Sequence, residues 1–562
     1  TETAMGGRFL FFSLESPLKQ KAEIANRHEG VRDLLKNPVG REKIQELFSG
    51  IYDLERIGTR IELGSASPRD LVSLRSSLQS LPELKEILYS FQSPILSNIV
   101  AGLSGHDEVR ELLEQSLADE VPLNVKDGGV IRAGFDVELD EIRMISKDQS
   151  QFLLDMEQRE RERTGIKALK VSFNKVFGYY IEISKGSAAQ APVEYVRKQT
   201  LVNAERFITE ELKTFENKIL GAQEKLNRLE AHLFQQIKDT VKKSVAEIMS
   251  TARYLALLDM LQSFAEAAAR YDYCQPTLRV EPGLFLKESR HPVVERLLKG
   301  ASFVPNDAEL NHGNQELIIL TGPNMAGKST YMRQIALIAL MAQAGSFVPA
   351  KVAEIAPLDR IFTRIGASDD LATGQSTFMV EMNEVAHILQ HGTENSLILL
   401  DEVGRGTSTF DGMSIARSVA EYIHQKISAF TLFATHYHEL TELGDSLPRG
   451  ANYSVAVQEK GNQVLFLRRI VPGGADRSYG IHVAELAGLP STVLERAREL
   501  LIELEDQGLS HRAKQVLNME SLFATDFRQE ILRLEPEKLT PMEAMQALYK
   551  LYQQAVREEG KK

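Results

Sequence analysis

The amino-acid sequence predicts a multidomain protein of the α and α/β classes. A helical part carries long antiparallel coiled-coil arms with a small β element, and an α/β domain and a helical tail follow it. Three observations predict this order. They are a Leu-rich helical periodicity, a change to period two between two helical seams, and a strand, a Gly-rich loop and a helix near residue 322.

The composition sets the wider bounds. A chain of 562 residues holds several domains, and 43% apolar with 26% charged residues is typical of globular proteins. No apolar run reaches the roughly twenty residues of a membrane span and no signal-peptide pattern is present. The single cysteine, Cys274, suits a reducing compartment or simple packing, and we expect a cytoplasmic protein. The net charge of −12 limits any nucleic-acid contact to a local basic patch.

Residues 1–138 form the first, Leu-rich helical part, and two apolar seams follow it. The outgoing seam comprises Leu139, Ile142, Ile145, Phe152 and Met156. The returning seam comprises Leu212, Phe215, Ile219, Ala222, Leu226, Leu229 and Leu233. Their three- and four-residue steps predict two helices packed as an antiparallel coiled coil.

Between the seams the apolar period becomes two. Leu169, Val171 and Phe173 alternate with polar residues, and so do Tyr179, Ile181 and Ile183, which predicts a small half-exposed sheet. Five polar or basic positions here could contact phosphates: Lys170, Asn174, Lys175, Arg197 and Lys198. On composition alone, an ordinary solvated strand face is the favoured alternative.

The strongest motif is a phosphate-binding loop. An apolar strand at 317–320 precedes it, and a helix at 330–341 follows it. Backbone N–H groups of such a loop and of the helix N-terminus hold phosphate oxygens. Lys328 is expected to reach the β and γ phosphates and Ser329 to ligate Mg²⁺. The predicted nucleotide-binding residues are Gly322, Pro323, Asn324, Met325, Ala326, Gly327, Lys328, Ser329 and Thr330.

Two further strands predict the catalytic groups. The apolar strand 396–402 ends in Asp401 and Glu402, where open α/β sheets bind ligands. We expect Asp401 to hold Mg²⁺ and Glu402 to polarise the attacking water. His436 ends the next strand and could sense the γ-phosphate. Phe303, upstream of the loop, could stack on adenine or simply pack in the core.

The sequence around these residues resembles that of the bacterial MutS family of DNA mismatch-repair ATPases, and the resemblance extends over nearly the whole chain. The segments that carry the resemblance are 321–330, 376–382, 401–411, 433–437 and 173–182. The resemblance implies a helical lever, a β clamp on coiled-coil arms and an ABC-type P-loop ATPase domain with ATP and Mg²⁺. It divides the chain into a lever (1–138), clamp and arms (139–228), a returning lever helix (229–262), the ATPase domain with a helix-turn-helix dimerisation element (263–505) and a helical C-terminal extension (506–562).

The resemblance also implies partners. Ser376 is expected to reach the nucleotide of a second subunit, so the ATPase becomes competent as a homodimer, with a higher oligomer left open. Residues 479–490 resemble the helix-turn-helix at the dimer interface. Double-stranded DNA, held by backbone contacts, and a MutL-type repair protein are the other expected partners. Ala326 stands where some relatives have Gly, which is compatible with the loop.

The family's mismatch reader carries a Phe-x-Glu motif in an N-terminal domain. The only triplet here with that spacing begins at Phe264 in an Ala-rich helical run, and a wedge between bases needs an exposed end. We therefore expect a partial sequence that lacks the mismatch-binding and connector domains and does not recognise a mismatch by itself.

Three alternatives stay open. One is a MutS paralogue acting on branched or recombination-intermediate DNA. Another is a transporter-type ATP-binding subunit, which would need a Leu-Ser-Gly-Gly-Gln signature that the sequence lacks. The last is a non-enzymatic scaffold, against which Glu402 argues because a pure binder needs no base beside Asp401.

Overall fold

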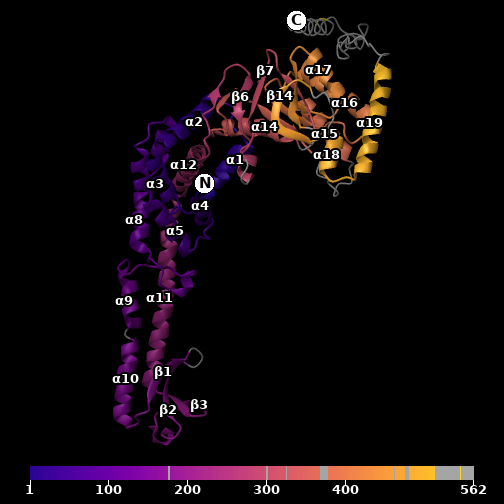
Figure 1. Ribbon diagram of the computed structural model, residues 1–562. Helices are drawn as coiled ribbons and strands as arrows, with labels where there is room; N and C mark the ends of the chain where they lie inside the picture. The colour runs from indigo at the N-terminus through magenta and orange to yellow at the C-terminus, as the bar shows by residue number, and fades with distance from the viewer. Residues whose placement is uncertain are drawn as a thin grey trace. The chain divides into compact units, whose positions relative to one another are not determined.

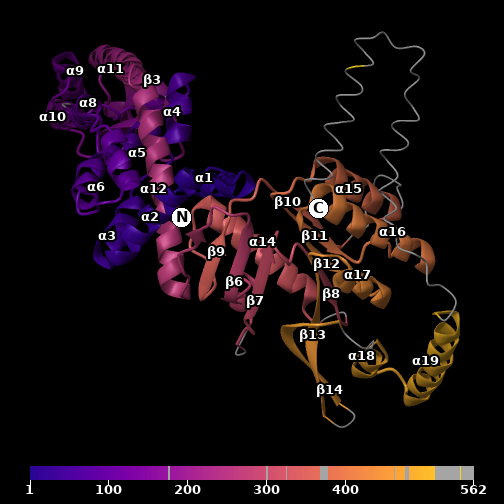
Figure 2. The ribbon, with the colours of Figure 1, turned by 90° about the horizontal axis from the view of Figure 1, so that it is seen from above.

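The computed structural model describes residues 1–147, 149–174, 178–298, 302–323, 326–366, 377–460, 463–474, 480–512 and 545. The chain forms two compact units (Figures 1 and 2). The first comprises 1–276 and 340–348, and the second comprises 277–339 and 349–562. The expectation of a mixed helical and α/β protein with several sheets is confirmed. No described helix is long and apolar enough to cross a membrane.

The first unit is built on a helical body. Its helices are α1 (Ala4–Glu15), α2 (Lys21–Lys36), α3 (Pro38–Phe48), α4 (Leu54–Glu62), α5 (Pro68–Gln79), α6 (Leu81–Leu88), α7 (Pro94–Gly102), α8 (Asp107–Ser116), the short η1 (Val125–Asp127) and α12 (Val245–Tyr271). Local signals explain where they begin. Pro38, Pro68 and Pro94 occupy first-turn positions, and Ser67 with Asp70 forms a capping box on α5.

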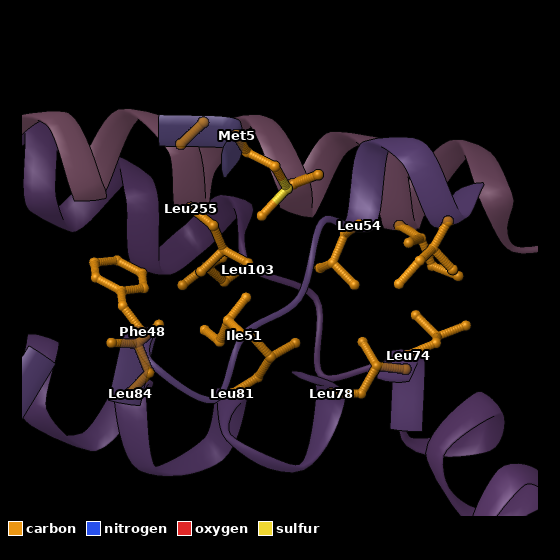
Figure 3. Packing of buried hydrophobic residues seen from close by; sticks show 14 of the residues in the cluster. Met5, Phe48, Ile51, Leu54, Leu74, Leu78, Leu81, Leu84, Leu103 and Leu255 are labelled. Atoms are coloured by element: carbon orange, nitrogen blue, oxygen red, sulfur yellow. The ribbon is translucent and has the colours of Figure 1, made fainter. Parts of the chain in front are cut away.

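The core of this body is aliphatic. Figure 3 shows Met5, Phe48, Leu54, Leu74 and Leu255 of α12 in one cluster of almost fully buried side chains. Phe264 packs in the same cluster, as expected for a structural residue.

Buried Asp259 of α12 binds the residues that precede α1. It accepts hydrogen bonds from the backbone N–H groups of Glu2 and Thr3 and from the Thr3 hydroxyl. The first helix is thereby tied to α12.

The two arms are present. The outgoing arm consists of α9 (Val137–Lys147) and α10 (Gln149–Thr164), and the returning arm is the single helix α11 (Glu210–Lys242). Figure 1 shows α11 alongside α9 and α10. The rings of Phe152 and Phe215 stack with centroids 3.7 Å apart. Since α11 continues unbroken through residues 228 and 229, the expected division there lies inside one helix.

The arms carry a four-stranded antiparallel sheet in the order β1-β2-β4-β3. Its strands are β1 (Lys170–Asn174), β2 (Gly178–Ser184), β3 (Val196–Thr200) and β4 (Ala204–Ile208), with the turn η2 (Ala188–Gln190) between β2 and β3. The period-two pattern predicted the first two strands. It missed the other two because both are short and rich in polar residues. Phe173, expected on the inner face, is 48% exposed.

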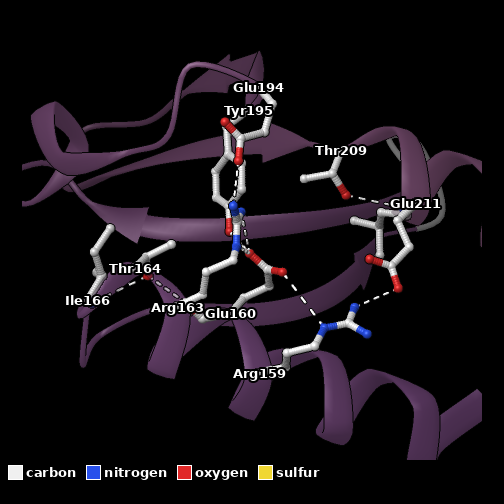
Figure 4. A network of polar contacts seen from close by, with 10 residues as sticks. Arg159, Glu160, Arg163, Thr164, Ile166, Glu194, Tyr195, Thr209 and Glu211 are labelled. Atoms are coloured by element: carbon white, nitrogen blue, oxygen red, sulfur yellow. Dashed lines mark hydrogen bonds and ion pairs between the residues drawn. The ribbon is translucent and has the colours of Figure 1, made fainter.

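A polar network joins this sheet to α10 (Figure 4). Buried Glu160 accepts hydrogen bonds from Arg163 and from the Tyr195 hydroxyl, both at 2.7 Å. Arg163 also pairs with Glu194. Burial, together with the hydrogen bond to Glu160, raises the pKa of Tyr195. The tyrosine therefore stays neutral and keeps its donor role.

The second unit centres on a six-stranded sheet in the order β10-β11-β12-β8-β13-β14, in which only β14 is antiparallel to its neighbour. The strands are β10 (Arg360–Arg364), β11 (Ser396–Asp401), β12 (Phe430–Ala434), β8 (Leu317–Thr321), β13 (Gly450–Lys460) and β14 (Gln463–Pro472). A smaller sheet joins β5 (Thr277–Leu278), β9 (Val352–Ile355), β6 (Gly283–Ser289) and β7 (Asn306–Asn311).

The second unit also contains helices, some of which pack on the large sheet. They are α13 (Val294–Leu297), α14 (Lys328–Ala344), α15 (Thr377–His391), α16 (Thr409–Tyr422), η3 (Ile423–Ile427), η4 (His438–Leu440), α17 (Thr441–Ser446), α18 (Gly480–Leu486) and α19 (Ser491–Arg512). Ile319, Leu400 and Phe433 pack with apolar residues of α15 and α16. Ile318 and Leu320, on the opposite face of β8, are also fully buried. Burial on both faces is what the continuous apolar strands predicted.

Two helices run across bounds expected from the sequence. Helix α12 (Val245–Tyr271) continues through residue 263, and the compact units divide after Pro276. Helix α19 runs past residue 505 to Arg512. Val493 and Leu500, expected to face inward on α19, are 50% and 40% exposed, whereas Leu494 is buried. Apart from residue 545, the expected extension beyond Arg512 lies outside the described residues.

A buried ionic cluster lies at the start of β8. The Glu316 carboxylate, 1% exposed, is 2.9 Å from Nε of Arg449, 3.1 Å from Nδ1 of His312 and 3.3 Å from Nδ1 of His424. Burial opposes ionisation of Glu316, but the two histidine hydrogen bonds and the charge of Arg449 outweigh it and lower its pKa below the usual 4.5.

We predict that Glu316→Gln destabilises the protein by about 2 kcal/mol at pH 7, because it removes the buried negative charge that is hydrogen-bonded by His312 and His424 and paired with half-buried Arg449. A carboxyl with a lowered folded pKa stabilises fully above its unfolded value of 4.5, and loses this effect as pH falls through the folded pKa. Chemical denaturation at a series of pH values measures this. The variant should lose part of the acid dependence, whereas exposed Glu309→Gln should keep it; equal pH profiles for wild type and Glu316→Gln would contradict the assignment.

Candidate nucleotide site

The predicted loop connects β8 to α14. Gly322 (φ +129°) and Gly327 (φ +110°) adopt left-handed backbone conformations that side chains disfavour. A Cβ on Gly322 would also lie 3.3 Å from the side chain of Val455. These constraints explain the two glycines of the motif. Pro323, Ala326 and Thr330 are described with them, whereas Asn324 and Met325 lie outside the described residues.

Lys328, the first residue of α14, is 3% exposed and bonds back onto its own loop. Its Nζ donates to the carbonyl oxygens of Gly322 and, at 3.2 Å, Pro323. Burial lowers the pKa of Lys328, against the opposing charges of Glu402 and Asp401. The ammonium is therefore held at the loop, where a phosphate would be a stronger partner than two neutral carbonyls.

Ser329 and Asp401 meet as predicted. The Ser329 hydroxyl donates to Oδ2 of Asp401 at 2.5 Å, while Oδ1 is buried without a hydrogen-bond partner among the described residues. No described group of three or more His, Cys, Asp or Glu side chains could hold a metal. Mg²⁺, however, is commonly held by one or two protein oxygens together with phosphates and waters. A hydroxyl beside a carboxylate with a spare oxygen fits that ion.

Glu402 lies just beyond β11 with φ at +58°, which is unusual for a residue with a side chain. Its backbone N–H donates to the carbonyl of Ala434 at 2.9 Å. Its Oε1 is hydrogen-bonded to Nε2 of His436, and its Oε2 accepts from Arg405 at 2.6 Å. The bond to His436 chiefly lowers the pKa of Glu402 to about 2, helped by the charges of Arg405 and Lys328 and opposed by burial. The predicted base and sensor are thus in contact.

A cavity of about 230 Å³ lies beside the loop. Phe303 lines it together with Gly327 and Thr330, and so do Tyr331, Gln334 and Arg468. Phe303 therefore lies beside the loop rather than in a closed core. This position suits the stacking role that the sequence suggested for it.

The sequence reasoning missed several supporting residues. Arg405 lies in segment 401–411, which carries the family resemblance, but the sequence suggested no role for it. Glu381, 4% exposed, accepts from the Gly404 N–H at 2.6 Å and pairs with Arg364 at 3.1 Å. The Tyr437 hydroxyl donates to the Gly404 carbonyl. The only sequence signal for Glu381 and Tyr437 is their position inside segments 376–382 and 433–437. Their contacts with Gly404 could not be predicted, because Gly404 is distant from both in sequence.

The remaining predicted residues are either not described or belong to the first unit. Ser376 and Lys175 lie outside the described residues. On the small sheet of the first unit, Lys170 and Lys198 are exposed, Asn174 is half-buried and Arg197 pairs with Glu205 at 2.9 Å.

Taken together, the strand, the glycine loop, the helix and the carboxylates at the strand ends define a candidate phosphate- and metal-binding site on an α/β sheet. Comparison with known proteins gives a more specific answer. Residues 1–265 match the profile of MutS domain III, and residues 318–505 match that of MutS domain V. The chain belongs to the MutS family of DNA mismatch repair proteins.

Individual relatives agree. The chain is 50% identical to DNA mismatch repair protein MutS of Symbiobacterium thermophilum over 99% of its own length and 65% of the relative's. It is 48% identical to the protein of that name from Carboxydothermus hydrogenoformans, covering 99% of the chain and 67% of the relative. It is 50% identical to the protein of that name from Desulfitobacterium hafniense, covering 98% of the chain and 65% of the relative. The chain thus spans about two thirds of the length of these relatives.

We predict that Asp401→Asn weakens magnesium-dependent ADP binding about tenfold to a hundredfold. The amide keeps the shape and the bond to Ser329 but removes the negative charge. Equilibrium titration with ADP, with and without Mg²⁺, tests this. Exposed Asp445→Asn in the same unit is the control. An unchanged response to Mg²⁺ in Asp401→Asn would rule out the metal role.

Proposed function

We propose that this chain is the motor part of a DNA mismatch-repair ATPase: it binds Mg·ATP, hydrolyses ATP in response to DNA and uses the cycle to move a DNA clamp. One observation carries the proposal. Ser329, Asp401, Glu402 and His436 converge at the carboxyl ends of the neighbouring strands β8, β11 and β12.

Nucleotide binding would exchange partners that the site already holds. Lys328 leaves the carbonyls of Gly322 and Pro323 and turns to the β and γ phosphates. The loop residues and Thr330 supply N–H groups at the start of α14. Ser329 and Asp401 are the protein ligands offered to Mg²⁺, which when bound neutralises phosphate charge. Phe303 stacks on the base.

Hydrolysis requires Glu402 to be released. While both its oxygens are paired with His436 and Arg405, the carboxylate is a weak base. An incoming γ-phosphate carries negative charge and competes with the Glu402 carboxylate for the same two hydrogen-bond donors. We propose that His436 turns to the γ-phosphate and that Glu402 then orients the attacking water. The site is thereby kept inactive until the triphosphate is present.

The other regions would serve this motor. The lever (1–138 and 229–262) carries the clamp and arms (139–228), and Lys170, Asn174, Lys175, Arg197 and Lys198 contact the backbone of double-stranded DNA. The ATPase domain (263–505) pairs with a second copy, whose nucleotide Ser376 reaches in trans. The extension (506–562) supports a higher oligomer. The protein acts in the cytoplasm, in association with the nucleoid, and a MutL-type protein is its downstream partner.

We predict that Glu402→Gln lowers ATP turnover by about a hundredfold or more, while ATP affinity stays within a few-fold, because only the base is lost. Steady-state turnover and equilibrium ATP binding separate the two effects. The control is Glu394→Gln, an exposed residue two positions before the start of β11. Turnover that survives in Glu402→Gln would show that the water is activated elsewhere.

The same assay with DNA tests the biological role. Homoduplex, mismatched and branched DNA are compared on the wild-type chain. Stimulation by duplex DNA that depends on Glu402 supports the proposal. Stimulation restricted to branched DNA would favour a paralogue of recombination intermediates, and absence of any turnover would favour a nucleotide-binding scaffold.

We predict that Lys198→Ala lowers the slope of log affinity for duplex DNA against log salt by about 0.9, the value for one phosphate contact. Lys198 is exposed on β3. Exposed Lys218→Ala on α11 is the matched control and should leave the slope unchanged. Binding isotherms between low and moderate salt measure both. A parallel shift with no change in slope would exclude a direct phosphate contact by Lys198.

A further inference from the structure

A buried carboxylate on α15 holds the turn that follows Glu402. Glu381 is 4% exposed, and its Oε1 accepts a hydrogen bond of 2.6 Å from the backbone N–H of Gly404, two residues beyond Glu402. A hydrogen bond to a carboxylate is about twice as strong as one to a neutral acceptor. Glu381 therefore has a direct and strong hold on the backbone segment that carries the proposed base.

Gly404 is tightly enclosed at this turn. It is buried, its φ is +89°, and a Cβ there would collide with the backbone of Gly412 in α16. Its carbonyl accepts a hydrogen bond of 3.2 Å from the hydroxyl of Tyr437. Burial, together with the charge of Glu381, raises the pKa of Tyr437, so the phenol keeps the proton that it donates. Both backbone polar groups of Gly404 are thus bound by side chains from other segments.

These bonds bear on the backbone of Glu402, which lies between two anchors. Its own N–H donates to the carbonyl of Ala434 at 2.9 Å, and the N–H of Gly404 donates to Glu381. Val403 between them is 1% exposed. A residue with a side chain keeps a φ of +58° only where its surroundings impose it. Without the anchor at Gly404, the backbone of Glu402 would be free to relax, and its carboxylate would move with it.

An ion pair explains the burial of Glu381 and fixes the direction of its carboxylate. Its Oε2 is 3.1 Å from Nη2 of Arg364, whose side chain is 6% exposed. Arg364 is the last residue of β10, the strand beside β11. Nε of Arg364 is also 3.1 Å from Oε2 of Glu384, whose side chain is 50% exposed. Since Oε2 of Glu381 is held by Arg364, its Oε1 is directed to Gly404, and one carboxylate joins the sheet edge to the turn.

We propose that Glu381 is a positioning residue for ATP hydrolysis: acting through Gly404, it holds the backbone of Glu402 so that the base is aligned with the attacking water. This inference rests on the ATPase function proposed above. A misplacement of about 1 Å in a reacting group can cost about a hundredfold in rate. Loss of the anchor should therefore lower kcat and leave ATP affinity almost unchanged, because Lys328 and Ser329 keep their places.

Glu381→Gln tests this in the full chain. An amide that turns its oxygen to Gly404 must direct its NH₂ group at Arg364, which places a donor against a donor. In steady-state turnover with duplex DNA, kcat should fall about tenfold to a hundredfold, while equilibrium ATP binding changes by less than about threefold. Glu384→Gln is the matched control on the same helix. It also removes a charge beside Arg364 but leaves the bond from Gly404 to Glu381 intact, so its kcat should stay unchanged.

Combining Glu381→Gln with Glu402→Gln separates positioning from general damage. A residue that acts only through the base should cost no further turnover once the base is removed. Single-turnover hydrolysis measures these low rates. Losses that multiply in the double variant, or a full kcat in Glu381→Gln, would overturn the inference and leave the proposed function intact. Wild-type turnover that is absent, or that survives in Glu402→Gln, would instead defeat the proposed function itself.

Tyr437→Phe tests the same turn without disturbing the buried ion pair, so it remains informative should Glu381→Gln fail to fold. It removes the other side-chain bond to Gly404. Its kcat should fall about threefold to tenfold, the effect of one hydrogen bond, again with no further loss in the Glu402→Gln background. If Tyr437→Phe is the only folded variant of the two, an unchanged kcat would overturn the inference.

Discussion

Parallel pairing of β8, β11 and β12 is the constraint on which the candidate site depends. Ala434 of β12 lies between Leu320 of β8 and Asp401 of β11 in the strand register. The three strands therefore end at the same edge of the sheet. Residues that follow these strands are brought together although more than a hundred positions separate Ser329 from His436. Register between apolar strands buried on both faces is strongly specified, because a slip would misplace every side chain. The packing of the strands therefore determines the positions of the polar side chains at this edge.

The polar groups at this edge satisfy one another. Lys328 is bound to loop carbonyls, Ser329 to Asp401, and Glu402 to both His436 and Arg405. Buried or half-buried charges are costly without partners, so this mutual pairing stabilises the fold. It also sets the condition that a ligand must meet. A nucleotide has to offer each group a better partner than it already has, and phosphate oxygens do so for cations but not for carboxylates.

Most of this arrangement could be predicted from the sequence because its signals are local. The glycine loop, the strand ending in Asp401 and the strand before His436 are each recognisable within about ten residues. The structure has β8 before the loop, and β11 and β12 as the other two strands. What the sequence could not show depends on tertiary neighbours. The φ of Glu402, the Arg405 bond and the bond between Gly404 and Glu381 leave no periodic trace. The strands β3 and β4 were missed for the related reason that polar, short strands have no alternation to detect.

The strained backbone at Glu402 persists because the opposite end of the sheet is held firmly. Backbone N–H groups of Glu316 and Leu317 donate to the carbonyl of Arg449, and Thr431 donates to the carbonyl of Glu316. The Glu316 carboxylate then binds the Arg449 side chain itself. These bonds join the starts of β8, β12 and β13, so the register of the central strands is set at the end away from the loop. A residue in an unfavourable conformation survives only where its surroundings over-determine it. The buried ion cluster and the candidate nucleotide site therefore lie at opposite ends of the same strands, and the fixed register at the first end supports the unfavourable backbone conformation of Glu402 at the second.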